Sequence, residues 1–407
     1  MRVLITGSGG REHAIAWTLS RSPQLDELHA APGNPGIAQL GECHPVRAED
    51  GEGLLDLAHA LRFDLVVIGP EAPLVRGVGD ELRHAGVSVF GPSKEAARIE
   101  GSKAFAKEVM RAAGVPTAET MSVARAPCVL KVDGLSAGKG VFVCPDQRSL
   151  DDALREVERL GQPVVAEELL EGDELSVFGL TDGQNVVGLA PARDFKRVGD
   201  NDTGPNTGGM GSFSPVPEFD PDGAVEELLD AVHRPVIAEL SRRGSSFVGL
   251  LYAGLMLTEA GPKVLEFNCR FGDPETQSIL PRLRGDLLEA LAAAASGDLA
   301  GRVVEAGEDA AVTVVLAGRD YPERPDSGTP IDGVEAAEAE GALVFHAGTA
   351  MRGDQLVTNG GRVLNVTAVG PTVEEARHRA YAACEQISFE GMRYRRDIAE
   401  GAVNVGT

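Results

Sequence analysis

The stretch LEFNCRFGDPETQ, residues 265–277, alternates apolar and polar side chains. Side chains along a strand point to opposite faces in turn, so Glu266, Asn268 and Arg270 share one face of a predicted strand. The apolar side chains between them share the other face, which we expect to pack into a core. Two hard oxygens this close suit Mg²⁺, which takes one or two protein ligands and keeps the rest for water and phosphate. A half-exposed strand with a salt bridge would give the same pattern, so other segments must distinguish the two interpretations.

Composition limits the class of protein. A chain of 407 residues is long enough for two or three domains. Its formal charge of -24 argues against nucleic-acid or acidic-membrane partners. No apolar run approaches the ~18 residues of a membrane span, and the N-terminal run is too short for a signal peptide. The five cysteines are widely spaced without a CxxC, which argues against a disulfide framework or a zinc site. We expect a cytoplasmic protein whose partners are small molecules.

The first zone of the chain, residues 1–100, alternates short apolar runs with helical patterns. This alternation predicts an α/β domain with a doubly wound parallel sheet. Ligands of such sheets bind beyond the carboxyl ends of the strands. Those ends carry glycine- or proline-rich loops here, namely GSGGREH, APGNPG, GPEAP and GPSK.

The two later zones have a different character. Within residues 101–300, APCVLKVDGLSAGKGVFVC predicts two strands joined by a glycine loop. Residues 162–191 predict a three-stranded antiparallel meander with tight turns at Glu171-Gly172 and Asp182-Gly183. Residues 198–217 have no period and predict a long functional loop. The last zone, residues 301–407, predicts an α+β domain that closes with a helix, where Thr372 and Glu375 fit a capping box.

Two glycine-rich loops fail the phosphate-binding fingerprints that they suggest. GSGGREH has Glu12 where a dinucleotide site needs its third glycine, and no acidic residue ends the second strand. A nicotinamide or flavin cofactor is therefore disfavoured. Gly9 and Gly10 at a helix N-terminus, with Arg11 beside them, remain either a small anion site or a plain turn. In DGLSAGKGV, the spacing to Lys139 and the glycine after it rule out a P-loop.

Charged residues in the middle zone also need partners. Lys131 lies within the apolar strand VLKVDG, where an unpaired ammonium would be costly, so it requires a carboxylate or a nucleotide phosphate. Glu167 and Glu168 end another strand, and Glu174 follows the next turn. The Glu174 carboxylate could accept hydrogen bonds from a ribose, and the backbone of Glu167 to Leu170 could read an adenine edge, or these acidic residues could simply be solvated.

Taken together, these features resemble the ATP-grasp enzymes, in which two α+β subdomains grip ATP between antiparallel sheets. The resemblance is closest to the glycinamide ribonucleotide synthetase family, the phosphoribosylamine–glycine ligases, and extends over about residues 1 to 400. It rests on motifs in this order: GSGGREHA, GPEAPL, GSKAF, KRVGDNDTGPNTGGMG, LYAGLM, EFNCRFGDPETQ and TNGGRV. It implies an N-terminal Rossmann-like domain (1–100), an ATP-grasp domain (101–300) with a small antiparallel lid at about 117–180, and a C-terminal α+β domain (301–407).

The resemblance implies the second step of purine synthesis, in which ATP, glycine and 5-phosphoribosylamine give ADP, phosphate and glycinamide ribonucleotide. A carboxylate is a poor acyl donor, so phosphoryl transfer would first make glycyl phosphate, which the amine then attacks. Such catalysis depends mostly on positioning and charge stabilisation, so no nucleophilic side chain is required. The family also suggests a monomer.

The resemblance further implies roles for individual residues. Glu266 and Asn268 would hold Mg²⁺ or Mn²⁺, and Arg270 and Lys131 would act in catalysis. The residues expected to bind ATP, the co-substrate, are Lys103, Lys131, Gly134, Glu167, Glu168, Leu170 and Glu174. The residues expected to bind the other substrates are Gly9, Gly10, Arg11, Pro70, Glu71, Thr207, Gly208, Gly209, Met210 and Asp273.

The sequence departs from the family pattern in the lid. Only TMSVARAP stands where a helix usually precedes the VLKVDG strand, and RLGQP replaces a longer glycine-rich loop. Phe195 stands where the family usually has histidine. A trimmed lid bears on ATP affinity and on the suppression of wasteful hydrolysis, because lids exclude water.

Three other functions fit the sequence less well than the ligase does. A related ATP-grasp enzyme that uses bicarbonate or formate would share the nucleotide residues but not the NDTGPNTGGMG loop. A non-catalytic nucleotide-binding protein would have no reason to keep Lys131, Glu266, Asn268 and Arg270 together. A dehydrogenase conflicts with the incomplete glycine fingerprint.

Overall fold

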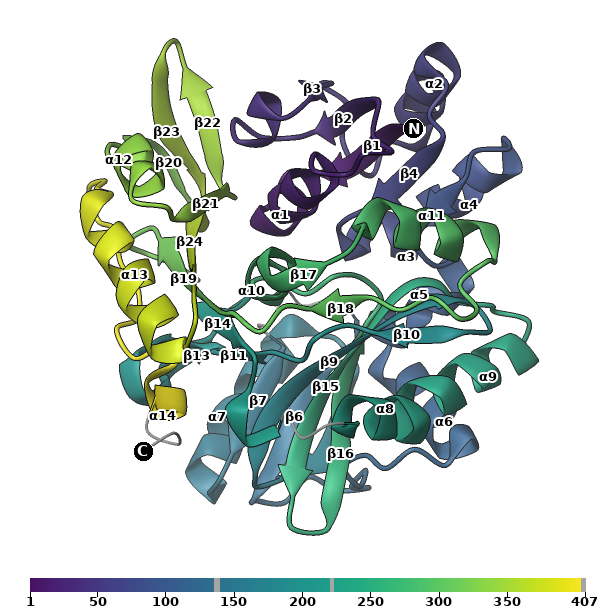
Figure 1. The fold of residues 1–407 in the computed structure, drawn as a ribbon. Helices are drawn as coiled ribbons and strands as arrows, with labels where there is room; N and C mark the ends of the chain where they lie inside the picture. Colours follow the sequence, from purple (N-terminus) through teal and green to yellow (C-terminus); the bar gives the residue numbers. More distant parts are fainter. Residues whose placement is uncertain (135–139, 220–222, 404–407) are drawn as a thin grey trace.

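The N-terminal part of the protein is a five-stranded parallel sheet with the strand order β3-β2-β1-β4-β5, as predicted for a doubly wound domain (Figure 1). The structure is a computed structural model that describes residues 1–134, 140–219 and 223–403. Only the short edge strand β3 was not expected. The elements are β1 (Arg2–Gly7), β2 (Glu27–Pro32), β3 (Glu42–Cys43), β4 (Leu65–Ile68) and β5 (Val89–Phe90), with α1 (Gly10–Leu19), α2 (Gly51–Leu61), α3 (Glu71–Arg76), α4 (Val78–His84) and α5 (Lys94–Gly101).

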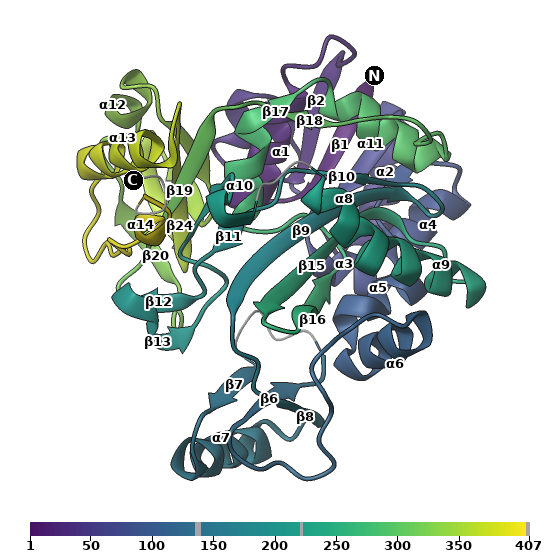
Figure 2. The same ribbon diagram turned by 60° about the horizontal axis from the view of Figure 1, so that its bottom comes forward.

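A small antiparallel sheet, β7-β6-β8, projects from the rest of the molecule together with one helix (Figure 2). Its buried residues, among them Leu130, Leu150 and Val157, form a separate apolar cluster. The predicted glycine loop joins β6 to β7, and its residues 135–139, including Lys139, lie outside the described residues. The elements here are β6 (Cys128–Val132), β7 (Val141–Cys144), α7 (Gln147–Leu160) and β8 (Val164–Glu168). The preceding helix α6 (Lys103–Ala113) packs against α5 on the main body.

The predicted three-stranded meander is wrong in its first half. β8 pairs with β6 in the small sheet, whereas the next strand joins a second antiparallel sheet of order β10-β9-β15-β16. The two strands separate because they pack into different cores, β8 through Ala166 and β9 through Leu175 and Val177. The hairpin between β9 and β10 is present as predicted. The second sheet consists of β9 (Asp173–Asp182), β10 (Val186–Gly188), β15 (Val248–Thr258) and β16 (Gly261–Asn268).

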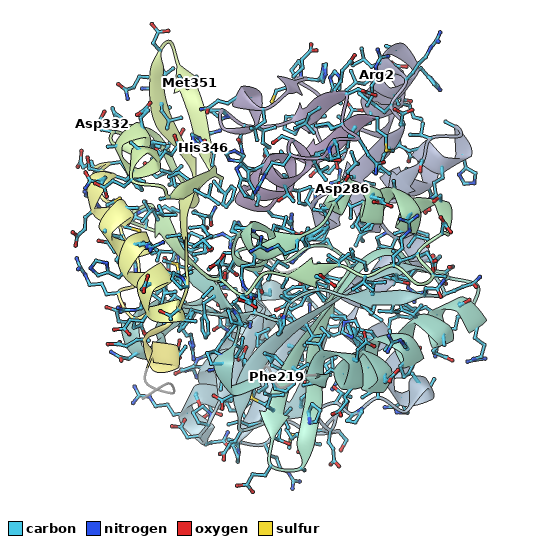
Figure 3. The ribbon with its side chains drawn as sticks, in the orientation of Figure 1. Arg2, Phe219, Asp286, Asp332, His346 and Met351 are labelled. Carbon is cyan, nitrogen blue, oxygen red and sulfur yellow. The ribbon has the colours of Figure 1, made fainter. Side chains whose placement is uncertain are left out.

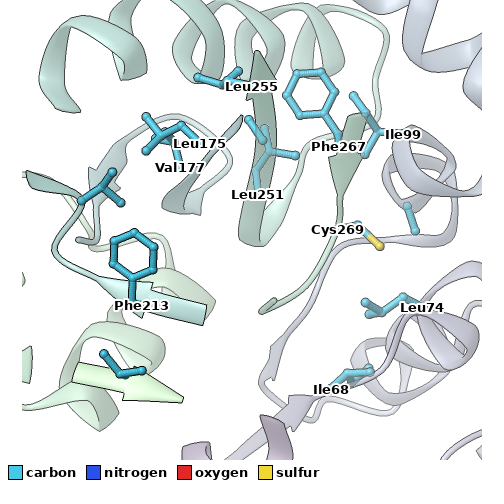
Figure 4. Packing of buried hydrophobic residues seen from close by; sticks show 14 of the residues in the cluster. Ile68, Leu74, Ile99, Leu175, Val177, Phe213, Leu251, Leu255, Phe267 and Cys269 are labelled. Atoms are coloured by element: carbon cyan, nitrogen blue, oxygen red, sulfur yellow. The ribbon is translucent and has the colours of Figure 1, made fainter. Parts of the chain in front are cut away.

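The apolar face of the 265–277 segment packs into the main core, as the alternation predicts. Phe267 and Cys269 are 3% and 1% exposed and lie in the same cluster as Ile99 and Leu251 (Figure 4). Phe271 is also buried, but it packs into a second cluster beside Phe90 of the N-terminal sheet. The segment is therefore anchored in two cores, and this fixes the direction in which the side chains of its polar face point.

A third sheet, β11-β14-β19-β24-β21, is antiparallel and joins chain segments from both sides of residue 300. Thr372 caps the following helix by accepting from the Glu375 amide at 3.2 Å, but the Glu375 side chain pairs with Arg379, so only half of the predicted capping box is present. The strands are β11 (Arg193–Asp194), β14 (Gly211–Ser214), β19 (Ala310–Ala317), β21 (Leu343–His346) and β24 (Arg362–Gly370), and the helix is α13 (Val373–Gln386).

Residues 198–217 were expected to form an irregular loop, and this is wrong for most of them. They contain most of the hairpin of β12 (Arg197–Gly199) and β13 (Thr203–Asn206), followed by β14. β14 has no apolar period because its buried Ser212 and Ser214 are satisfied by hydrogen bonds to Pro274 and Pro191 carbonyls, both within 2.8 Å. A hydropathy pattern does not predict such a strand, because its buried side chains include small hydroxyl groups.

The remaining elements lie around and between these sheets, and α10 among them is fully buried (Figure 3). No described helix, within residues 1–134, 140–219 and 223–403, is long and apolar enough to cross a membrane. These elements are β17 (Leu283–Arg284), β18 (Glu305–Ala306), β20 (Asp326–Pro330), β22 (Thr349–Arg352), β23 (Gln355–Gly360), α8 (Ala224–Leu228), α9 (Arg234–Arg242), α10 (Glu275–Ile279), α11 (Leu287–Ser296), α12 (Val334–Ala339) and α14 (Glu400–Val403).

Candidate functional site

Arg270 lies just beyond β16, where it meets two carboxylates of the N-terminal part. Its guanidinium is 3.4 Å from the Glu71 carboxylate and 3.3 Å from that of Glu100. Burial alone would raise the pKa of Glu71, but the charges of Arg270 and Arg11 lower it to about 2. Burial raises the pKa of Glu100, although Arg270 opposes this. The two carboxylates therefore fix the Arg270 guanidinium where the end of β16 meets the helices of the N-terminal sheet, a place that we call the junction.

The loop after β1 brings Arg11 to the same junction. Arg11 donates to the Phe271 carbonyl at 3.1 Å and lies 4.0 Å from Glu71. Glu12 is buried and accepts hydrogen bonds from the Gly9 amide and from Arg11, both at 2.6 Å. A Cβ on Gly9 would lie 2.7 Å from the Glu12 carboxylate. Glu12 therefore stands where a dinucleotide fingerprint has its third glycine, and its side chain fills the space beside Gly9.

Arg362, at the start of β24, joins two of the predicted substrate segments. It forms an ion pair with Asp273 at 2.8 Å and donates to the Asp273 and Gly208 carbonyls at 2.8 and 2.5 Å. The Thr207 hydroxyl donates to the Lys196 carbonyl at 2.8 Å and accepts from the Gly209 amide at 3.0 Å. The 207–210 loop is thus held against Asp273.

Lys131 satisfies the requirement for an anion with a carboxylate. Its ammonium is 2.8 Å from Glu167 and donates to the Leu265 carbonyl at 2.8 Å. Lys107 contacts the other oxygen of Glu167 at 3.0 Å. Glu168 instead accepts from Lys263 at 2.7 Å, a bond that lowers the pKa of Glu168. The Glu168–Lys263 ion pair and the Lys131–Leu265 hydrogen bond link the small sheet to β16.

A second lysine, Lys196, sits between two carboxylates. It is 2.6 Å from Glu174 and 2.7 Å from Asp194. Burial lowers the pKa of Lys196, but the two carboxylates outweigh this and raise it well above its usual value. Burial raises the pKa of Asp194 to about 7, against the opposing effect of Lys196. Glu174, assigned to ribose from the sequence, is therefore engaged by a cation.

Glu266 and Asn268 have the donor chemistry of a magnesium site. Glu266 is half-buried and Asn268 is 8% exposed. Neither side chain hydrogen-bonds to another side chain or backbone group in the part of the chain that the structure describes. A carboxylate and an amide oxygen that remain open on one face suit a hard divalent cation.

The other predicted residues differ in their contacts and in how exposed they are. Lys103 donates to the Gly134 carbonyl at 2.7 Å, beside the glycine loop. Pro70 precedes α3 and Leu170 lies half-buried after β8. Met210 is fully buried in a cluster with Val198 and Ala317, so its side chain faces a core and only its backbone can face a ligand.

The comparisons with known proteins cover the whole chain. Three domain descriptions of phosphoribosylglycinamide synthetase match it: the N domain at residues 1–100, the ATP-grasp (A) domain at 101–276 and the C domain at 311–401. The chain belongs to the phosphoribosylglycinamide synthetase family. It is 51% identical to the phosphoribosylamine–glycine ligase of Streptomyces coelicolor over 418 residues, which covers 99% of each chain. It is 48% identical to that of Mycobacterium leprae, with full coverage of both.

Solved structures agree with this membership. The phosphoribosylamine–glycine ligase of Thermotoga maritima superposes with a TM-score of 0.84 at 37% identity, covering 98% of this chain and 100% of that one. The biotin carboxylase domain of Hydrogenobacter thermophilus 2-oxoglutarate carboxylase has a TM-score of 0.69 at 16% identity, covering 99% of this chain and 98% of that one, which shows the shared ATP-grasp fold. ATP-grasp ligases use ATP with a divalent metal ion, and this ligase family acts on small molecules.

Several residues of the junction were not singled out from the sequence. Glu100 and Lys107 each pair with a predicted site residue but lie in no distinctive local pattern, and Arg362 holds a site loop. Asp194 pairs with Lys196, which in turn holds Glu174. Arg362 was within reach, because it ends the TNGGR portion of a motif that carried the family resemblance.

Proposed function

We propose that this protein joins glycine to 5-phosphoribosylamine with ATP, which gives glycinamide ribonucleotide, ADP and phosphate. The observation that carries the proposal is the set of bonds made by Arg362, which hold the 207–210 loop against Asp273 of the EFNCRFGDPETQ segment. These two segments are the family's long motifs. Their contact brings the segment after β16, the strand that would bind the metal, to the loop expected to hold the amine.

At the nucleotide end, Glu266 and Asn268 would bind Mg²⁺ or Mn²⁺, which bridges phosphate oxygens and neutralises their charge. Lys103 and Lys131 would contact the phosphates, and Glu174 the ribose. Glu167, Glu168 and Leu170 would hold the adenine. Lys131 is already neutralised by Glu167, so we expect this pair to orient the ammonium rather than to leave it as a free charge.

At the transfer centre, Arg270 would face the phosphoryl group as it moves to the glycine carboxylate. Glu71 and Glu100 both pair with the guanidinium, so the cation is in place before the substrate binds. A cation already in place stabilises developing charge at no cost in reorganisation. Loss of one such group typically lowers the rate by roughly 10²–10³.

At the amine end, Gly9, Gly10, Arg11, Pro70 and Glu71 would hold phosphoribosylamine. Arg11, near the start of α1, and Glu71, at the start of α3, lie 4.0 Å apart, and this contact supports a shared substrate site between the two loops.

We also propose the remaining features of the family for this chain. They are a monomeric state, a cytoplasmic location and domain boundaries near residues 100 and 300, with a lid at about 117–180. The small sheet β7-β6-β8 with α7 would be this lid. It would close over the triphosphate and exclude water from the acyl phosphate.

ADP release from the purified protein, with Mg²⁺ and ATP, tests the proposal. Glycine and freshly generated phosphoribosylamine are added separately and together. We expect release that requires both, with stoichiometric glycinamide ribonucleotide. Release with bicarbonate or formate in place of glycine would assign a different acid substrate, and ATP binding without any release would refute catalysis.

A further inference from the structure

Two short strands of the N-terminal sheet carry the same Glu-x-His pattern. β2 contains Glu27 and His29, while Glu42 starts β3 and His44 follows it. His29 is the register partner of Glu42 across the parallel pair. Because side chains two residues apart share a face, all four side chains lie on one face of the β2–β3 pair. The function proposed above uses none of them.

The four side chains converge within contact distance. His29 Nδ1 is 3.0 Å from His44 Nε2 and 3.8 Å from the Glu42 carboxylate. One ligand atom from each of His29, Glu42 and His44 can be chosen so that all three lie within 4.8 Å of one another. Two atoms bound to one tetrahedral cation at 2.0–2.2 Å lie roughly 3.3 Å apart. The separations of 3.0 and 3.8 Å at His29 lie on either side of this value, and the three ligand atoms all lie within 4.8 Å of one another.

The surroundings of His29 also fit a metal ligand. Its other ring nitrogen, Nε2, is 3.4 Å from the Glu27 carboxylate, which Arg2 holds from the far side at 3.0 Å. A carboxylate on the second nitrogen keeps the proton there and leaves Nδ1 free to bind a cation. His29 is only 5% exposed and its ring lies 5.2 Å from that of Phe63.

We propose that His29, His44 and Glu42 bind a divalent transition-metal cation such as Zn²⁺, with Glu27 orienting His29. Two imidazoles and one carboxylate select a borderline cation over Mg²⁺, which prefers oxygen ligands. Cysteine spacing gave no sign of this site because it contains no thiolate. The Glu42 side chain is 68% exposed, so water can complete the coordination sphere.

Binding requires a local rearrangement at His44. His29 Nδ1 and His44 Nε2 form a hydrogen bond at 3.0 Å, and the two ring planes are 26° apart. A cation would replace the hydrogen between them, which would move to His44 Nδ1, and the His44 ring would tilt toward the metal. His44 lies just after an edge strand and is not fully buried, so its ring has room to turn. The bound cation would tie β3 to β2.

Zinc titration of the chelator-treated full chain tests the site, with excess Mg²⁺ present to occupy oxygen-ligand sites. We expect one equivalent of Zn²⁺ to bind and to raise the melting temperature. His44→Ala and Glu42→Gln should each weaken binding at least ~10-fold, and Glu27→Gln by roughly 10–100-fold. The matched control is His59→Ala, an exposed histidine on α2, which should bind as the wild type does.

Cobalt provides an independent readout of geometry, because histidine-bound Co²⁺ of low coordination number absorbs visible light strongly. We expect that absorption in the wild type and in His59→Ala, and its loss in His44→Ala. Ligase turnover should be unchanged in His44→Ala, so failure of this site and failure of the proposed function are distinguishable. Zinc affinity that is equal in wild type and His44→Ala, or zinc that ATP displaces, would overturn the proposal.

Discussion

At the scale of single residues, the site is organised by cations that are paired before any substrate arrives. Arg270 lies between Glu71 and Glu100, and Lys131 is held by Glu167. In each case the pair is partly or fully shielded from water, where such interactions are strong and costly to break. Charged groups fixed in this way need not reorganise during phosphoryl transfer.

Replacement of Arg270 by alanine should lower turnover by roughly 10²–10³ while ATP still binds. The reason is that the guanidinium would act on charge that develops only during transfer. Initial rates of ADP release, with circular dichroism to check folding, measure the effect. Arg47→Ala, at an exposed position, is the control. Wild-type turnover in a folded Arg270→Ala protein would contradict the assignment.

Glu71 should contribute stability that depends on pH in acid. Its folded pKa of about 2 lies below the usual value, so the contribution is fully present above about pH 4.5 and is lost as the pH falls toward 2. The shift corresponds to about 3 kcal/mol. Glu71→Gln should therefore flatten the fall in unfolding free energy over that range, as measured by urea denaturation at a series of pH values. An unchanged slope, matching that of exposed Glu52→Gln, would show that Arg270 does not stabilise this carboxylate.

At the scale of elements, strand β24 contributes to a site that lies mostly in other segments. Its first residue, Arg362, holds the 207–210 loop and Asp273 with both ends of its guanidinium. A lysine carries all its donors on one nitrogen and lacks the planar fork of arginine, so it cannot reach the Gly208 carbonyl and the Asp273 carboxylate from two separate nitrogens as Arg362 does. Misplacement of a binding loop by about 1 Å can cost on the order of 10² in rate.

We therefore expect Arg362→Lys to lower kcat/KM for phosphoribosylamine by about 10², with the fold intact. Steady-state kinetics at saturating ATP and glycine measure this change. Arg352→Lys, at the exposed end of β22, should leave kinetics unaltered. Equal kcat/KM values in both variants would mean that Arg362 is not needed to place the loop.

Local patterns predicted the elements that depend on local periodicity. The alternation at 265–277 gave the buried and polar faces of β16, and the βα alternation gave the parallel sheet. Local patterns failed where packing between distant segments decides the structure. β8 pairs in one sheet and β9 in another, and β14 shows no apolar alternation because its buried side chains include serines. Pairs such as Arg362 with Gly208 join residues far apart in the chain, so no spacing rule reveals them.

At the scale of the whole molecule, Gly10 marks the contact between the N-terminal helix α1 and the C-terminal sheet. A Cβ there would lie 2.1 Å from the Asn365 amide nitrogen and 2.8 Å from that of Gln277. Gly10→Ala should therefore cost about 1–3 kcal/mol of stability, as overpacking does, and should weaken amine binding. Gly101→Ala is the matched control, because its Cβ would meet only Val75 at 3.4 Å or more. Equal melting temperatures would contradict this tight contact.

The small sheet and the main body meet through a few polar contacts, which include Lys131 to Leu265 and Glu168 to Lys263. Its own apolar cluster is small, so we expect its amides to exchange faster than those of the N-terminal sheet. ATP bound between the small sheet and β16 would add contacts to both sides.

Hydrogen exchange with and without ATP and Mg²⁺ tests this arrangement. At a ligand concentration 100 times Kd, binding contributes about 2.7 kcal/mol, which corresponds to roughly 100-fold slower exchange through openings that release ATP. We expect this slowing in β6 and β8 and not in β1, and we expect Glu266→Gln to diminish it by weakening the metal bridge. Uniform slowing across all sheets would indicate a global effect of ATP. No slowing in β6 and β8 would show that these strands do not cover the nucleotide.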